Sequence, residues 1–202
     1  MICAYLRIPY TPPDDQALGE DAHTRHEERR QELQVRLTAQ RILSAHLKPK
    51  AAKDFWNDID LDLNGAHLHY LNLTDCHVRK ALFNGARFTG PAGFLSTTFE
   101  DAKFFGATFA GYVWFAQATF TTSPGFVAVT FTEGVVFTGP TFAGGIGFHK
   151  ARVAPGSGVV LPTGWITRTA QPGEGEEEDW LYVVRDEDSS EQPAEAPGDG
   201  PA

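Results

Sequence analysis

The sequence predicts an all-β solenoid, in which the chain winds into a four-sided parallel β-helix after one N-terminal α-helix. Two observations support this fold class, and a third indicates a disordered acidic C-terminal tail. A large apolar residue recurs about every five positions between residues 63 and 153. Six-residue intervals interrupt this spacing only at two opposite corners of the predicted coil. The net charge of −9 comes mainly from residues 171–202, which hold eleven acidic residues and one basic residue.

The first expected elements are an N-terminal extension over residues 1–23 and an α-helix over residues 24–48. The helical segment is rich in Glu, Gln, Arg, Leu and Ala, contains no Gly or Pro, and stops before Pro49. Its five arginines are interleaved with glutamates. A solvated helix face is therefore favoured over a nucleic-acid-binding surface.

Residues 56–153 carry the repeat that defines the predicted solenoid. A period of five fits neither an α-helix nor a single strand, which place apolar residues every three to four or every two positions. Eighteen large apolar residues share one register, and thirteen of the fifteen phenylalanines are among them. These residues are Leu63, Leu68, Leu73, Val78, Phe83, Phe88, Phe94, Phe99, Phe104, Phe109, Phe115, Phe120, Phe126, Phe131, Phe137, Phe142, Phe148 and Val153.

The repeated unit has the form A-x-F-x-x, with a small residue two positions before the large one. Two inward residues separated by one outward residue form a very short strand. The remaining two residues turn a corner. Each coil leaves unpaired strand edges, so only the stacking of successive coils satisfies its backbone. Alanine leaves room for phenylalanine, because two large residues in each unit would overfill the interior.

The longer intervals indicate how many sides the coil has. They are 88–94, 109–115, 120–126, 131–137 and 142–148. If the sides are numbered as faces 1 to 4 in rotation from Leu63, three insertions fall between faces 2 and 3. The other two fall between faces 4 and 1, which is what a four-sided coil predicts. Pro124 and Pro140 stand where alanine is usual and indicate distorted coils toward the C-terminal end.

The segments LNGAHLHYLNL, NGARFTG and FEDAKFFGATF resemble the pentapeptide-repeat family, over about residues 59–153. The resemblance implies a right-handed, four-sided parallel β-helix. It says little about function, because the repeat encodes a shape and not a site. The phenylalanine-rich units and CAYLRIPYTPP (residues 3–13) further resemble long actinobacterial members. In those proteins this segment ends an upstream helical domain that follows membrane-spanning segments, which implies that the chain is the soluble part of a membrane-tethered protein.

The C-terminal part is predicted to form a cap over residues 154–185, followed by a disordered acidic tail over residues 186–202. The segment DWLYVV (residues 179–184) has the composition of a short strand. The residues after it are rich in Glu, Asp, Pro, Gly and Ser. Such a composition buries too little apolar surface to offset the entropy of ordering.

A cytoplasmic location is predicted. No apolar run is long enough to span a membrane, and the N-terminal residues lack the features of a signal peptide. The two cysteines, Cys3 and Cys76, form no disulfide framework and suit a reducing compartment.

No catalytic, cofactor or metal site is predicted. His67, His69, Cys76 and His77 are close in sequence, but the repeat places both His67 and His69 outward on face 2, His77 outward on face 4, and Cys76 inward. They diverge, so surface histidines and a core thiol are favoured over a metal site. Asp58, Asp60 and Asp62 alternate on the first strand and are expected to be solvated, since a narrow coil offers no catalytic pocket.

The outward residues between the phenylalanines are the candidates for function. On face 3 the repeat places Leu95, Trp114 and Val136 outward, which forms a candidate interaction face. An exposed apolar strip is usually covered by a partner or by the chain itself. We expect self-coverage, either by the helix over residues 24–48 or by the strand over residues 179–184.

Three function hypotheses follow. The favoured one is a non-enzymatic scaffold that binds an unknown protein partner and has no small-molecule substrate. The sequence does not indicate its oligomeric state. The second follows from the resemblance, since some pentapeptide-repeat proteins mimic DNA and bind type II topoisomerases such as gyrase. That role needs an acidic coil, whereas residues 56–153 hold seven acidic and six basic residues. The third is the membrane-tethered protein described above. Direct nucleic-acid binding is not expected.

The inward assignment predicts the effect of a charge in the phenylalanine stack. We expect Phe115→Asp to collapse the coil, because it buries a carboxylate without a partner. Circular dichroism and the melting temperature measure this effect. If both stay at their wild-type values, Phe115 does not point inward.

Overall fold

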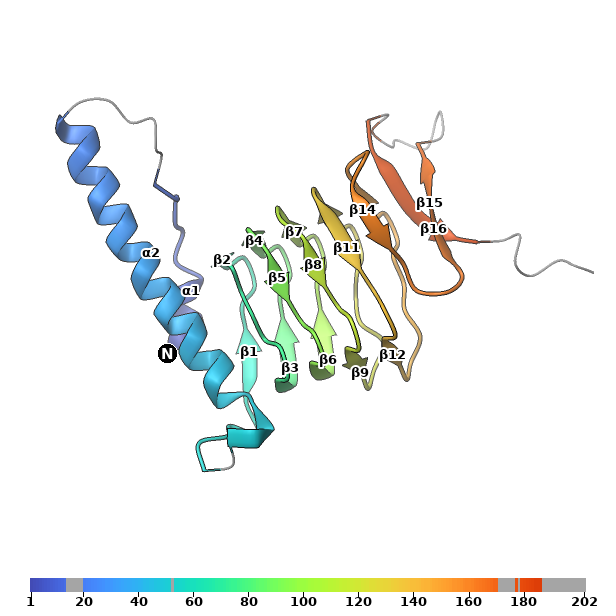
Figure 1. Cartoon of the computed structure of the whole chain (residues 1–202), viewed down its shortest axis with the longest axis horizontal. Coiled ribbons are helices and arrows are strands. Elements are labelled where there is room, and N and C mark those ends of the chain that lie inside the picture. Colours follow the sequence, from blue (N-terminus) through green and yellow to red (C-terminus); the bar gives the residue numbers. More distant parts are fainter. Residues whose placement is uncertain (14–19, 52, 171–176, 178, 187–202) are drawn as a thin grey trace, which may run out of the picture.

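The structure, a computed structural model, describes residues 1–13, 20–51, 53–170, 177 and 179–186, and for residues 20–23 it describes the backbone only. Helix α1 (Ile2–Leu6) and helix α2 (Glu20–His46) come first, followed by a 3-10 turn over Pro49–Ala51. Figure 1 shows α2 leaning against one end of a row of stacked coils. Helix α2 begins four residues before the predicted start and ends two residues before the predicted end.

Three sheets run along the coils. Sheet A consists of β1 (Asp60–Asp62), β3 (His77–Leu82), β6 (Thr98–Lys103), β9 (Thr119–Phe120) and β12 (Thr141–Phe142). Sheet B consists of β2 (His67–His69), β4 (Arg87–Thr89), β7 (Thr108–Phe109), β10 (Thr130–Phe131), β13 (Arg152–Val153), β16 (Leu181–Arg185) and β15 (Trp165–Thr169). Sheet C consists of β5 (Ala92–Gly93), β8 (Val113–Trp114), β11 (Gly134–Val136) and β14 (Gly158–Val160).

The sheets correspond to the predicted faces. Sheet B forms face 2 and sheet C forms face 3, while sheet A covers face 4 and bends onto face 1. Face 1 continues toward the C-terminus through bridges from Lys103 to Gly125 and from Gly125 to Gly147. The long strands β3 and β6 pass around the corner between faces 4 and 1. The six-residue intervals 120–126 and 142–148 interrupt this passage, so β9 and β12 end on face 4.

Four columns of stacked phenylalanine rings fill the interior. Within each column the ring centroids of successive coils lie 4.3 to 5.4 Å apart. The columns are Phe83–Phe104–Phe126–Phe148, Phe88–Phe109–Phe131, Phe94–Phe115–Phe137 and Phe99–Phe120–Phe142. The predicted β-solenoid is therefore confirmed, with four rings around each coil. Its right-handed sense stays a prediction of the family resemblance.

The C-terminal coils are less closed than the others. All the register residues are buried except Phe142, which is half-buried. Phe142 follows Pro140, which is also half-buried although the repeat places it inward. Proline carries no N–H for the ladder and cannot pair as alanine does there, so the predicted distortion appears at this coil.

Turns with a left-handed residue close the corners after faces 1 and 3. In most of them the N–H that follows the left-handed residue donates to the carbonyl three residues earlier, as at Ala107 and Phe104 (3.0 Å). The third residue of this type II turn requires a positive φ, which glycine adopts without strain. Gly106 provides it with φ of 64°, whereas Ala128 occupies the equivalent position in the next coil with φ of 54°.

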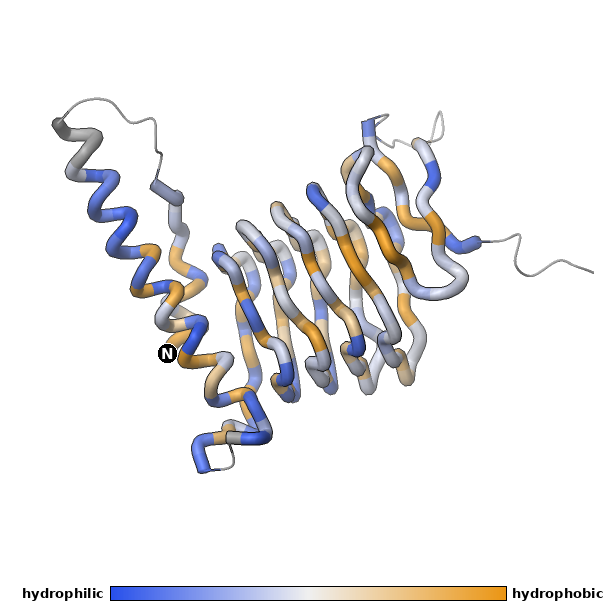
Figure 2. Tube along the Cα trace, in the orientation of Figure 1, coloured by the Kyte–Doolittle hydropathy of each residue, from blue (hydrophilic) through white to orange (hydrophobic). Residues whose placement is uncertain are grey.

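The two ends of the coil are covered by different elements. Leu43 and Leu47 of α2 belong to the same buried core as the first coil, and the His77 N–H donates to the Leu47 carbonyl at 2.7 Å. At the other end, the Trp165 ring packs edge-on against Phe148 at 4.9 Å. Strand β16 pairs antiparallel with β13 and with β15. Figure 2 shows apolar segments recurring from coil to coil and polar residues along much of α2.

Three further expectations concern membrane spans, the C-terminal cap and the acidic tail. No helix among the described residues is long and apolar enough to cross a membrane. The predicted strand over residues 179–184 corresponds to β16, and β14 and β15 also lie within the predicted cap. The predicted disorder of residues 186–202 falls outside the described residues, except for Asp186.

The left-handed corner at Ala128 predicts a stabilising substitution. A non-glycine residue in this conformation costs roughly 1–2 kcal/mol, while glycine loses about 0.5–1 kcal/mol more conformational free energy on folding. We expect Ala128→Gly to raise the free energy of unfolding by about 0.5–1 kcal/mol in urea denaturation. The control is Ala116→Gly, at a turn residue without a positive φ, which should lower it by about 0.5–1 kcal/mol. Equal changes in both variants would contradict the assignment.

Candidate interaction surface

Sheet C presents one row of outward residues along face 3. From coil to coil the row runs Asn72, Gly93, Trp114, Val136 and Val160. The predicted face of Leu95, Trp114 and Val136 is therefore wrong in one position, because Leu95 does not belong to this row. Leu95 follows the inward Phe94, whereas Trp114 precedes the inward Phe115, so Gly93 and not Leu95 is the partner of Trp114.

A hollow of about 350 Å³ lies over Gly93 in this surface, where the row has no side chain. Three large side chains stand around it and remain accessible. Leu95 is 41% exposed, Trp114 39% and Tyr70 63%. The other lining residues are Leu71, Asn72, Thr74, Pro91 and Ala116. The surface is thus apolar and concave at the position where the row has no side chain.

Tyr112 extends the aromatic surface at the corner between faces 2 and 3. Its ring lies 6.0 Å from the Trp114 ring, with 19° between the planes, and it is 40% exposed. The insertion in 109–115 makes room for Tyr112 because Gly111 approaches the preceding corner closely. A Cβ at Gly111 would lie 2.4 Å from the carbonyl carbon of Gly90, so only glycine fits there.

The expected self-coverage of this strip is wrong for the described residues. Helix α2 packs on the N-terminal end of the coil, and β16 pairs with β13 on face 2. Both elements instead cover the open apolar ends of the solenoid, as a stack of repeats requires. Leu95 and Trp114 are left exposed to solvent.

His69 was expected at the surface, and this expectation is wrong. Its side chain is only 3% exposed, because α2 and the N-terminal segment pack over face 2 of the first coil. Gln40 bonds the backbone of His69 through two hydrogen bonds, and the Tyr10 ring lies edge-on to the imidazole at 5.2 Å. Within the part of the chain that the structure describes, the His69 Nε2 atom has no hydrogen-bond partner. The repeat alone could not show this burial, since the covering residues precede the repeat by tens of positions.

The other members of the His/Cys group lie as predicted. His67 is half-buried on the outward row of face 2, in register with Arg87, and His77 pairs with Glu100 at 2.8 Å on face 4. Cys76 is buried, and burial raises the pKa of its thiol to about 11. Within the described parts of the chain, no three His, Cys, Asp or Glu side chains gather to hold a metal ion.

The alternating aspartates at the start of the coil are engaged in ion pairs. Arg79 bridges Asp58 and Asp60, at 2.6 and 2.9 Å. Asp62 pairs with Arg7 of the N-terminal segment. These carboxylates are exposed and matched by guanidinium groups, so they act as contacts between neighbouring segments.

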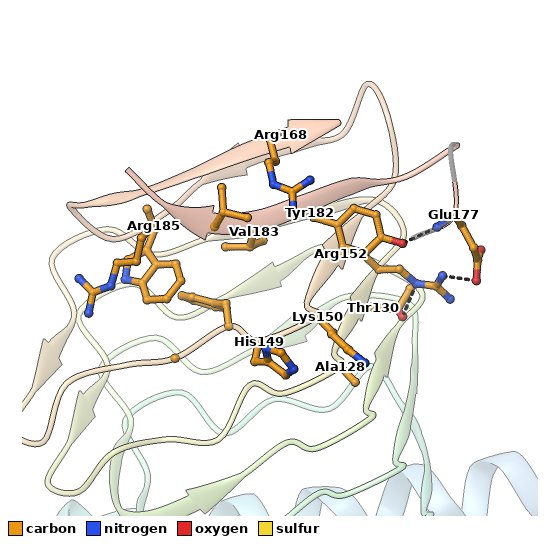
Figure 3. A pocket seen from close by; sticks show the side chains of 14 residues that line it. Ala128, Thr130, His149, Lys150, Arg152, Arg168, Glu177, Tyr182, Val183 and Arg185 are labelled. Carbon is orange, nitrogen blue, oxygen red and sulfur yellow. Dashed lines mark hydrogen bonds and ion pairs between the residues drawn. The ribbon is translucent and has the colours of Figure 1, made fainter. Parts of the chain in front are cut away.

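A larger hollow, of about 880 Å³, lies at the C-terminal end between the β15–β16 hairpin and the last coil. Figure 3 shows basic side chains around it, including Lys150, Arg152 and Arg185. Arg152 is bound by Glu177 at 2.5 Å and by Thr130 at 3.2 Å, and it stacks on Trp180. The guanidinium of Arg185 lies over the Trp165 ring at 4.6 Å. We assign Arg152 to the attachment of the cap, because Glu177 and Trp180 lie in the cap, whereas Arg185 and Trp165 pack together within it.

Comparison with known proteins identifies the repeat. A family model described as pentapeptide repeats (9 copies) matches residues 73–122 and, overlapping with them, residues 104–152. No curated protein and no solved structure gives a significant match.

The burial of His69 predicts a pH dependence of stability. Burial lowers the pKa of His69 below its ordinary value of 6.5, and the neighbouring Arg36 and His67 lower it further. The unfolded chain therefore binds the proton more tightly than the folded chain does. The contribution of neutral His69 to stability is fully present above pH 6.5 and is lost as the pH falls toward the folded-state pKa. We expect acidification from about pH 7.5 to about pH 5 to lower the melting temperature more in wild type than in His69→Phe. The same decrease in both proteins would show that His69 is not the titrating group.

Proposed function

This chain belongs to the pentapeptide-repeat family, and we propose that it is a non-enzymatic scaffold that binds a protein partner through face 3. The observation that supports this role most strongly is the exposed apolar surface around Gly93. Leu95, Trp114 and Tyr112 are each about 40% exposed there, next to a preformed hollow. Exposed tryptophan and tyrosine beside a concavity are typical of the central residues of protein interfaces.

The filled interior supports the non-enzymatic part of the proposal. Phenylalanine rings occupy the coil along its axis, so a substrate could only bind outside the coil or at its ends. Pentapeptide-repeat solenoids are in general structural and not catalytic. The two cysteines are free, which suits the cytoplasmic location that we propose for the scaffold.

The charge distribution weighs against a DNA-mimic role toward gyrase. A protein that replaces DNA needs a surface of uncompensated negative charge. Along this coil most acidic residues are matched by a cation or by a histidine. The pairs are Asp58 and Asp60 with Arg79, Asp62 with Arg7, Glu100 with His77, and Asp101 with Lys103.

The proposal is tested by comparing the proteins captured by the full chain and by two variants. Trp114→Glu places a charge on the apolar surface and should abolish capture of the specific partner. Val127→Glu is the control, because Val127 is 37% exposed but lies on face 1. Quantitative mass spectrometry of the captured proteins, with circular dichroism of each bait, measures the effect. Equal capture by wild type and Trp114→Glu would rule out face 3 as the binding surface.

A further inference from the structure

A second hollow, of about 500 Å³, adjoins the one over Gly93. It lies between α2 and the first coil and is lined by Leu37, Gln40, Arg41, Ser44, Ala45, Lys48, Tyr70 and Asn72. Tyr70 and Asn72 also line the hollow over Gly93. The two hollows are therefore adjacent, and we refer to them together as the groove, which extends from α2 to sheet C.

The part of the groove next to α2 is basic. Arg41 and Lys48 line it, and no acidic residue lines either hollow. Neither cation is paired with a carboxylate among the described residues, whereas Arg30 and Arg36 on the same helix pair with Glu27 and Glu32. Arg41 is exposed and Lys48 half-buried, so both charges face the groove without internal compensation.

The floor of the groove is held in place. The Gln40 side chain donates to the His69 carbonyl at 2.7 Å and accepts from the His69 N–H at 3.1 Å. These two hydrogen bonds attach α2 to the first coil at the hollow next to α2, which Gln40 lines. A groove that needs no rearrangement loses less entropy when a segment binds.

We propose that this groove binds an extended acidic segment of a partner protein, with one large apolar side chain in the hollow over Gly93 and carboxylates beside Arg41 and Lys48. This inference rests on the proposed function and specifies the chemistry of the partner. Neighbouring coils are about 4.8 Å apart and an extended chain advances about 3.3 Å per residue. The hollow over Gly93 is one coil from Asn72, which lines the basic part, so the apolar anchor and the acidic residues are separated by at least about two positions.

The chain's own acidic C-terminus lacks one half of this pattern. Residues 187–202 contain five acidic residues but no Leu, Ile, Val, Met, Phe, Tyr or Trp. They match the basic part of the groove without supplying an anchor for the apolar part. A separate partner that carries both features fits the groove better.

Gly93 offers a variant that removes the apolar site and keeps the strand. Its φ is not left-handed, and the three atoms nearest to an added Cβ would belong to the Asn72 and Thr74 side chains, at 3.3 to 3.5 Å. Gly93→Val therefore fills the hollow with a residue that suits a strand. Gly147→Val is the matched control, because Gly147 is exposed on face 1 and has no atom within 4 Å of an added Cβ.

The experiment selects binders from a library of random twelve-residue peptides displayed on phage, with the immobilised full chain as target. The enriched peptides are synthesised with a fluorescent label, and their affinities are measured by anisotropy. We expect enriched peptides to combine a large apolar residue with nearby Asp or Glu. Gly93→Val should weaken their binding by roughly thirtyfold or more, and Gly147→Val should leave it unchanged.

Charge reversal tests the acidic part separately. Arg41→Glu and Lys48→Glu should each weaken binding by about fivefold to tenfold at low salt, and less as salt screens the charges. Arg30→Glu is the control on the same helix, outside the groove. One result would overturn this inference and leave the proposed function standing. In it, the enriched peptides bind Gly93→Val more weakly than wild type, but they contain no excess of Asp or Glu and bind Arg41→Glu and Lys48→Glu as tightly as wild type. No enrichment, or enriched peptides unaffected by both Gly93→Val and Trp114→Glu, would overturn both.

Discussion

Stacking of phenylalanine rings between successive coils is the interaction on which the rest of the structure depends. The ring spacing within the four columns, 4.3 to 5.4 Å, is close to the separation of about 4.8 Å between hydrogen-bonded strands. Ring contact and backbone pairing are therefore satisfied by the same geometry. A strand of two or three residues has little stability alone, and here each one is stabilised by the rings above and below it.

This constraint separates the residues that maintain the fold from those that can bind a partner. An inward position accepts little besides phenylalanine, leucine, valine or a small residue, because the interior has no spare volume. The outward positions carry no such requirement. Gly93 and Trp114, which are neighbours in register, produce a hollow beside a large aromatic side chain without any change inside the coil. Gly111 and Tyr112 likewise place a large aromatic side chain at the adjacent corner without any change inside the coil.

The sequence alone predicted the interior and only part of the surface. The five-residue spacing placed the inward phenylalanines correctly, and the six-residue intervals indicated four sides. The register of Leu95 was misjudged, because an outward residue can precede or follow the inward phenylalanine. His69 was misplaced for a different reason: the residues that bury it, Tyr10 and Gln40, belong to segments outside the repeat. Contacts between α2 and the first coil leave no periodic signal.

The direct test of this account is the solvent accessibility of individual phenylalanine rings. Phe104 and Phe105 are adjacent in sequence, but Phe104 is 0% exposed and Phe105 is 44% exposed. In NMR spectra of protein labelled with ring-13C phenylalanine, a soluble gadolinium chelate should broaden the Phe105 signals. It should leave those of Phe104 and of the other buried register positions sharp. Comparable broadening of Phe104 and Phe105 would contradict the stacked interior from which the account proceeds.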